Sequence, residues 1–170
     1  MRRILIVVSL LGGALAAAQK RPPVPPVPPV HPPPLPPSTE DALYADLAAA
    51  KWTPSEKAGL PAGAELALIG ADPVSTGVTA YLKAPAGWRL PPHWHTHTEY
   101  STMIVGKGTL TIAGKAHAVG PGAYAVIPGK TEHSFVCEVD PQAQIGGLPG
   151  CIVLVRRSGP TDVHWVDTKK

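Results

Sequence analysis

Short apolar stretches, separated by glycine and proline, follow one another from residue 65 to residue 156. Each stretch is about five to eight residues long, which is typical of β-strands and short for helices. No helical pattern lies between the stretches, and this argues against a parallel sheet with crossover helices. The spacing therefore predicts an all-β sandwich or barrel. The predicted strands are 65–70, 76–83, 99–105, 108–113, 123–127, 132–138 and 151–156.

Residues 1–18 have the pattern of an export signal. Arg2 and Arg3 precede an apolar run over 4–15, and residues 16–18 are all alanine, which offers a cleavage site. The run is shorter than the roughly 20 apolar residues that span a membrane. We expect an exported protein, periplasmic or extracellular, with no stable membrane insertion after cleavage. An uncleaved signal anchor is the alternative.

Residues 19–37 are predicted to be a proline-rich linker, because 11 of the residues from 22 to 37 are proline. Proline lacks a backbone donor, so this segment favours the extended polyproline II conformation. It can serve as a stiff spacer or as a ligand for a proline-recognising partner. The spacer is the interpretation that we favour.

A short N-terminal helix and a connector are expected over 38–59. Ser38 is suited to cap the helix, apolar residues including Leu47 recur at helical spacing, and Pro54 would stop it. The remaining residues, 60–170, would form the β-barrel.

The charge of the chain excludes one broad class of partner. The sequence has 15 Lys and Arg against 12 Asp and Glu, and two of the arginines, Arg2 and Arg3, lie in the predicted signal. The balance is then close to neutral, no basic run is present, and aromatic residues are only 5% of the chain. We therefore expect no nucleic-acid partner.

Three histidines lie close together with a glutamate, at His93, His95, His97 and Glu99. Side chains two residues apart on a strand point to the same face, so His93 and His95 can converge. If the chain bends after His95, the Glu99 carboxylate can lie close to the same two histidines. Neutral imidazoles and a carboxylate suit a divalent metal ion. The alternative is a histidine-rich surface turn, although crowding titratable groups on one face without a metal carries a desolvation cost.

These residues match the first motif of the cupin family along its full length. Gly87 is followed after five residues by His93, after one by His95, after three by Glu99 and after six by Gly106. The chain thus resembles a cupin over roughly residues 60–167.

The second cupin motif matches at Gly122, Pro128 and His133. Two positions depart from the usual pattern. Lys130 stands where the family usually has glycine, and Cys137 stands where it often has asparagine. Neither position is a ligand position of the family.

The resemblance implies an antiparallel jelly-roll β-barrel with the metal site inside. Matched position by position, the metal ligands would be His93, His95, Glu99 and His133. Four protein ligands leave up to two positions of an octahedral ion open, and iron, manganese, nickel, cobalt and zinc are all compatible. Three neutral histidines and one carboxylate would leave a bound dication with net positive charge, which would attract an anionic small molecule.

Two functions are compatible with the resemblance. The first is a metal-dependent oxidoreductase, of the dioxygenase kind, that acts on a small organic molecule. The second is a non-enzymatic cupin that binds or senses a small ligand outside the cytoplasm. The resemblance leaves open whether the protein is an enzyme, and it also implies a homodimer formed through strand edges.

Glu99, Tyr124 and His97 are the candidate catalytic residues. The Tyr124 phenol could donate a proton near a metal. His97 could replace a ligand, carry protons at the mouth of the cavity, or lie in a partly exposed loop, which is the interpretation that we favour.

Cys137 and Cys151 are the only cysteines. An exported chain with two cysteines can form one disulfide, and the two residues lie on consecutive predicted strands. The pair is expected to form a disulfide, with two separate thiols as the alternative.

Overall fold

A computed structural model of the protein describes residues 44–146 and 148–167. The predicted export signal, the proline-rich linker and the Ser38 cap lie outside the described residues. Among those described, no helix is long and apolar enough to cross a membrane.

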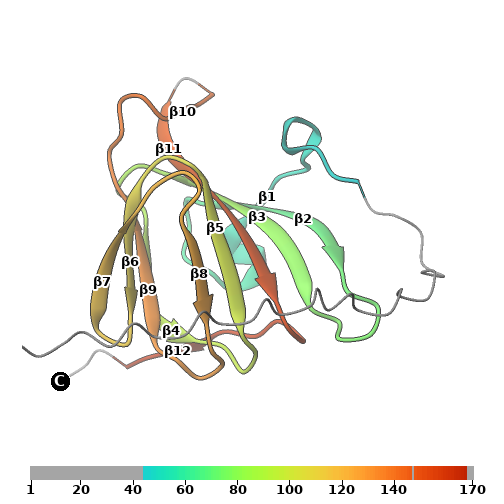
Figure 1. The fold of residues 1–170 in the computed structure, drawn as a ribbon. Helices are drawn as coiled ribbons and strands as arrows, with labels where there is room; N and C mark the ends of the chain where they lie inside the picture. Colours follow the sequence, from blue (N-terminus) through green and yellow to red (C-terminus); the bar gives the residue numbers. More distant parts are fainter. Residues whose placement is uncertain (1–43, 147, 168–170) are drawn as a thin grey trace, which may run out of the picture. The chain divides into compact units, whose positions relative to one another are not determined.

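Two antiparallel β-sheets form the fold, as expected for a jelly-roll barrel (Figure 1). The larger sheet has the strand order β1-β2-β3-β11-β5-β8, with β10 added beside β11, and the smaller sheet has the order β12-β4-β9-β6-β7. The strands are β1 (Thr53–Pro54), β2 (Glu65–Ala71), β3 (Val78–Pro85), β4 (Arg89–Trp94), β5 (Glu99–Val105), β6 (Gly108–Ile112), β7 (Lys115–Val119), β8 (Tyr124–Ile127), β9 (His133–Cys137), β10 (Gln144–Ile145), β11 (Leu148–Arg157) and β12 (His164–Trp165).

All seven predicted strands overlap observed strands, and β5 has the predicted bounds. Two longer strands were absent from the predicted ranges. β4 contains Pro91 and Pro92, which fall where the β4–β9 pairing changes register, so the missing donors interrupt no regular ladder. β7 is an edge strand whose residues are almost all exposed, and it therefore lacks the alternation that marks a half-buried strand.

The predicted N-terminal helix is wrong in the part that the structure describes. Residues Leu47–Ala49 form one 3-10 turn capped by Asp46, and Ser55–Ala58 form a second one. No residue of the first turn is buried. A short helix depends on burial of an apolar face, and this turn buries none of its residues. Instead the chain extends to pair Thr53 and Pro54 with β2.

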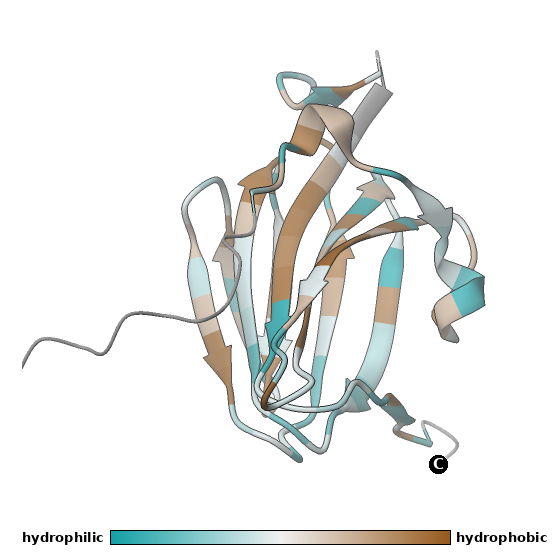
Figure 2. Cartoon of the chain, turned by 90° about the vertical axis from the view of Figure 1, so that its right-hand side faces the viewer, coloured by the Kyte–Doolittle hydropathy of each residue, from teal (hydrophilic) through white to brown (hydrophobic). Residues whose placement is uncertain are grey.

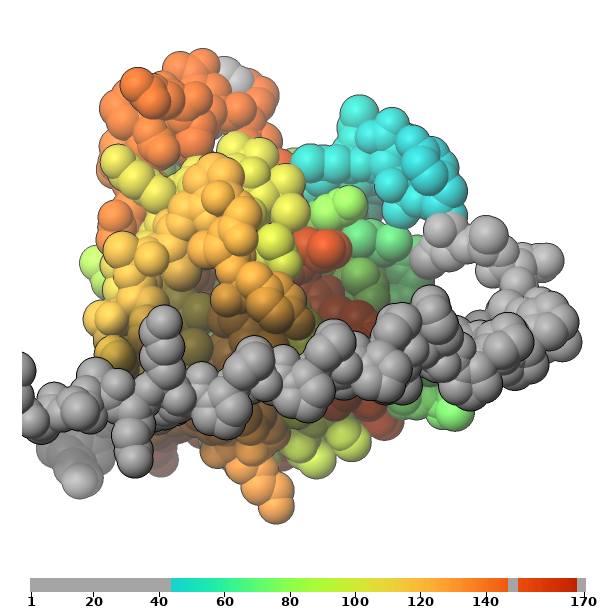
Figure 3. Space-filling view, in the orientation of Figure 1, coloured from blue at the N-terminus to red at the C-terminus, as the bar shows by residue number. Residues whose placement is uncertain are grey.

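Inward-facing apolar side chains of both sheets build the core. The larger sheet contributes Leu82 and Met103, and the smaller sheet contributes Leu110 and Phe135, all of them buried. In Figure 2 the apolar colour runs along the middle of several strands, and hydrophilic colour is common toward their ends and in the connections. In Figure 3 β11 is visible between β5 and the green strands of the same sheet, in agreement with its central position.

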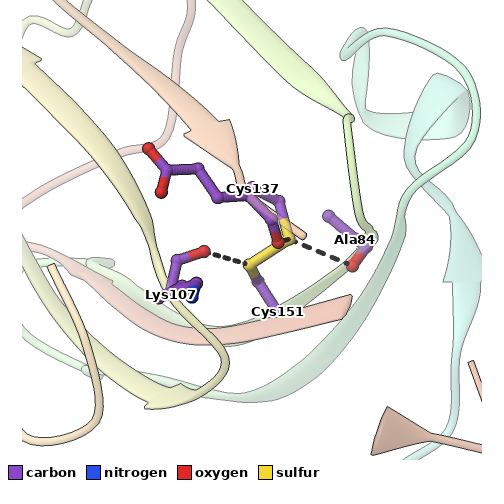
Figure 4. Close-up of a disulfide and its surroundings, with 5 residues drawn as sticks. Ala84, Lys107, Cys137 and Cys151 are labelled. Atoms are coloured by element: carbon purple, nitrogen blue, oxygen red, sulfur yellow. Dashed lines mark hydrogen bonds between the residues drawn. A yellow bond between two sulfur atoms is a disulfide. The ribbon is translucent and has the colours of Figure 1, made fainter. Parts of the chain in front are cut away.

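A disulfide between Cys137 and Cys151 links the two sheets, which confirms the expected pair. Cys137 ends β9 in the smaller sheet, and Cys151 lies in β11 of the larger sheet, with a Cα–Cα distance of 5.8 Å. Figure 4 shows the bridge beside the backbone carbonyls of Ala84 and Lys107. Both cysteines are fully buried. The opposite ends of the same two strands carry His133 and Arg157, so one pair of strands reaches both the disulfide and the candidate site.

Candidate metal centre

Three buried histidines converge at one end of the barrel. His93 lies in β4, His95 directly follows that strand, and His133 begins β9. The pairing of β4 with β9 sets His93 opposite His133. One ring nitrogen of each histidine lies within 4.8 Å of those of the other two, and no ring is more than 4% exposed.

Backbone carbonyls orient all three imidazole rings. The Nδ1 atom of His93 lies 2.7 Å from the carbonyl oxygen of Pro91, and that of His133 lies 2.9 Å from the carbonyl oxygen of Thr131. His95 Nδ1 contacts the carbonyl oxygen of Asp162. A carbonyl oxygen only accepts, so each Nδ1 carries a hydrogen, and in the neutral imidazole Nε2 then has the free lone pair. This is the arrangement that prepares a histidine to bind a metal through Nε2.

Glu99 begins β5 and brings a carboxylate to the same point. Its Oε2 atom lies 3.3 Å from His95 Nε2 and 3.5 Å from His133 Nε2. With the hydrogens on Nδ1, these contacts join an oxygen to two nitrogen lone pairs. His133 Nε2 is buried without a hydrogen-bond partner. These acceptor atoms face one another, and a cation between them would satisfy all of them. The donor set therefore fits a divalent metal ion.

The local electrostatics keep His93 neutral and Glu99 ionised. Burial, together with the neighbouring His133, lowers the pKa of His93 from 6.5 to about 4. Burial by itself would raise the pKa of Glu99, but the Arg157 guanidinium beside it is the main influence that holds that pKa well below its usual range. Neutral imidazole and ionised carboxylate are the forms that bind metal.

Arg157 is a site residue that the sequence analysis missed. It ends β11 directly opposite Glu99 on β5, and its Nη1 atom contacts the Glu99 carboxylate. Its Nη2 atom donates to His95 Nε2 at 2.7 Å. The signal was present but weak: Arg157 lies one residue beyond the predicted strand, at even spacing from the inward-facing Val153 and Val155.

The segment between β11 and β12 holds His95 from the other side. Besides its carbonyl, Asp162 accepts a hydrogen bond from the Thr96 backbone N–H at 2.9 Å, and its Oδ2 atom lies 3.1 Å from His164 Nε2. Burial by itself would raise the pKa of Asp162, but its hydrogen bonds with Thr96 and its contact with His164 together lower that pKa to about 2. His164 in turn stacks on Trp94 of β4, with ring centroids 3.9 Å apart.

The remaining candidate residues lie away from the three histidines. The His97 ring packs against Gly159, where an added Cβ would overlap it, and His97 is not among the converging group. Tyr124 borders the cavity, but its side chain is 63% exposed and it alternates along β8 with the inward-facing Ala125 and Ile127. His117 lies exposed on β7.

A cavity of about 340 Å³ extends from the histidines into the barrel. This volume is at the lower end of the range of about 300–1,000 Å³ that is typical of small-molecule sites. Its charged and imidazole groups gather at the metal end, and its other walls are mainly apolar. Five of the apolar lining residues are Leu82, Met103, Leu110, Phe135 and Val153.

Known proteins match this chain in both sequence and fold. The cupin domain model matches residues 80–145, a range that contains both histidine motifs. Dimethylsulfoniopropionate lyase DddW of Ruegeria pomeroyi is 40% identical over 50 residues, which are 29% of this chain and 33% of the lyase. The match thus spans only about a third of that enzyme.

Two solved structures share the fold at low sequence identity. A proposed acetylacetone dioxygenase from Methylibium petroleiphilum has a TM-score of 0.58 and 16% identity, over 79% of this chain and 87% of that one. An RmlC-like cupin from Shewanella frigidimarina has a TM-score of 0.56 and 14% identity, over 72% and 95% of the two chains. The match to the cupin domain model covers residues 80–145, and these neighbours share the two-sheet barrel, so the described domain has the cupin fold.

Proposed function

We propose that this protein is a metal-dependent cupin enzyme that acts on a small organic molecule inside the barrel. The observation that carries the proposal is the set of three Nδ1–carbonyl contacts, which leaves three buried Nε2 lone pairs converging on one point. His93, His95 and His133 would hold the ion, and Glu99 would complete the donor set. A bound dication would supply Lewis-acid polarisation of a ligand oxygen.

The protein's own residues would orient the ligand and keep water away from it. The aliphatic walls exclude water and hold an apolar group, which strengthens every polar interaction at the metal end. Glu99 would bind the ion as an anion, and before the ion binds, its charge is balanced by Arg157.

Oxygen-dependent oxidation is the reaction class that we place first. The donor set of three histidines and a carboxylate suits the redox metals iron and manganese, and it leaves open positions for two reactants. The fold shared with the proposed acetylacetone dioxygenase is compatible with this class.

A lyase is the second candidate, favoured by the 40% identity to the dimethylsulfoniopropionate lyase. The substrate that names that enzyme carries a carboxylate and a sulfonium group, and its carboxylate suits a site that contains a cation. Ligand binding without turnover is the non-enzymatic alternative. The buried disulfide supports the proposal of export, because disulfides persist in oxidising compartments.

Elemental mass spectrometry of the purified protein tests the metal site. We expect about one equivalent of a transition metal in the wild type and a loss of most of it in His93→Ala and His133→Ala. His117→Ala is the matched control, because it removes an exposed histidine from β7. No metal in the wild type after reconstitution, or full metal content in His93→Ala, would overturn the proposal.

Turnover assays on the loaded protein then separate the reaction classes. Oxygen consumption with a panel of small diketones and carboxylates would indicate a dioxygenase. Product release without oxygen would indicate a lyase. Saturable binding with neither result would indicate the non-enzymatic alternative.

A further inference from the structure

Arg157 is the only lysine or arginine among the described residues that line the cavity. Its side chain is 12% exposed, so the charge lies almost entirely within the barrel. A buried guanidinium requires acceptors, because desolvation of an unpaired charge is costly.

The acceptors of Arg157 are also the candidate metal ligands. Nη1 contacts Glu99 and Nη2 donates to His95 Nε2, while Nε is buried with no hydrogen-bond partner. The guanidinium therefore takes the position of a counter-cation for two of the four predicted ligands. A dication held by Glu99 and His95 would draw both acceptors away from it.

A ligand has to supply the acceptors that Arg157 then lacks. A carboxylate presents two oxygens in the geometry that matches the parallel N–H groups of a guanidinium. A dication, one guanidinium and one carboxylate also leave the site with net positive charge, which favours an anion. The rest of the lining is mainly apolar, including Leu82, Leu110 and Phe135, and its few other polar side chains are uncharged.

From these contacts we propose that Arg157 is the specificity-determining residue of the site. It binds the carboxylate of a substrate whose remaining part is apolar and lies along the barrel walls. The inference rests on the proposed metal function and deepens it by naming the substrate class. It also predicts that metal and carboxylate bind cooperatively, since the metal frees the guanidinium for the carboxylate.

Calorimetric titration of the full chain with hexanoate and with the neutral hexanamide tests this proposal. In the zinc-loaded wild type we expect hexanoate to bind roughly tenfold or more tightly than the amide, as a charge-assisted bidentate contact implies. Arg157→Met should bring this ratio close to one without reducing the zinc content. Arg156→Met is the matched control: Arg156 is the preceding residue of the same strand, is exposed, and pairs with Asp72. It should leave the ratio unchanged.

A metal-free arm separates this inference from the proposed function. Glu99→Gln removes the counter-anion of Arg157, so the metal-free variant should bind hexanoate in preference to hexanamide, and Glu99→Gln/Arg157→Met should not. If the wild type bound no zinc but the Glu99→Gln variant still preferred hexanoate, the proposed metal function would be wrong. The role of Arg157 in binding a carboxylate would be supported. A persistent hexanoate preference in Arg157→Met, or none in metal-free Glu99→Gln, would overturn the inference.

Discussion

Arg157 and Glu99 are cross-strand partners on β11 and β5, and their side chains form an ion pair inside the barrel. Their side chains are only 12% and 9% exposed. The pair thus joins the centre of the larger sheet to the candidate metal site, and it lies where a metal ion would compete for the carboxylate. Stability and metal binding are therefore expected to depend on the same contact.

Arg157→Met is expected to destabilise the metal-free protein by about 3–5 kcal/mol, because it leaves the Glu99 carboxylate buried without its cation. Glu99→Gln/Arg157→Met should recover much of this loss, since neither charge remains. Urea denaturation at pH 7 measures both variants against the wild type. Equal losses in the single and double variants would contradict a charge origin for the effect.

The stability of the metal-free protein should fall as the pH is lowered from about 6.5 to about 4. The pKa of His93 is about 4 in the folded protein and near 6.5 in the unfolded chain, so the unfolded chain binds the proton first. The contribution of neutral His93 to the free energy of unfolding is complete above pH 6.5. It is lost as the pH falls from about 6.5 to about 4. The free energy of unfolding in His93→Gln should show a smaller slope over the same window, and an unchanged slope would assign the effect to other groups.

Asp162→Ala is expected to weaken metal binding by up to about tenfold. The carbonyl that orients His95 remains, but the side chain that ties its segment to Thr96 and His164 is lost. Competition with a chelator measures the affinity. His164→Ala is the control, because it keeps the bond between Asp162 and Thr96 and should have the smaller effect. A larger effect in His164→Ala would indicate that the stack on Trp94 holds the segment instead.

The turn before His133 explains a departure from the usual motif. Lys130 has a left-handed backbone with φ of 63°, and its N–H donates to the carbonyl oxygen of His95 at 2.7 Å. Lys130→Gly should leave the stability unchanged or raise it by up to about 1 kcal/mol, since glycine adopts this conformation without strain. Gly129→Ala should be destabilising, because its Cβ would overlap the carbonyl oxygen of Thr96. Thermal denaturation compares the two variants, and a neutral Gly129→Ala would contradict this account.

The sequence predicted the parts of the molecule that depend on short-range patterns. β5 is a short stretch that ends at the Gly106 turn, and it has the predicted bounds. His93, His95 and His133 could be recognised because their spacing matches motifs that specify both strands and ligands. The disulfide followed from there being only two cysteines on neighbouring predicted strands.

Tertiary contacts determined what the sequence analysis missed. The apolar stripe around Leu47 has helical spacing, but the residues of this turn are not buried, and the segment forms a single turn. Arg157 resembles an exposed residue at a strand end, and only its pairing with Glu99 places it in the site. β4 was absent from the predicted strands, and its register change accommodates Pro91 and Pro92.

The Cys137–Cys151 disulfide should contribute to stability without shaping the metal site. The sequence separation is 14 residues, and a loop of about this length corresponds to roughly 3 kcal/mol of stabilisation. Cys137→Ala/Cys151→Ala should lower the free energy of unfolding by about 2–4 kcal/mol at pH 7.

The metal content of this double variant should equal that of the wild type while it remains folded, because the bridge joins the ends of β9 and β11 opposite to His133 and Arg157. Reductant should destabilise the wild type by a similar amount and leave the double variant unchanged. The double variant, which has no disulfide to reduce, is therefore the control for other effects of the reductant. If the folded double variant lost its metal, the bridge would have to fix the register of the two strands along their whole length, and the two ends of the barrel would be coupled.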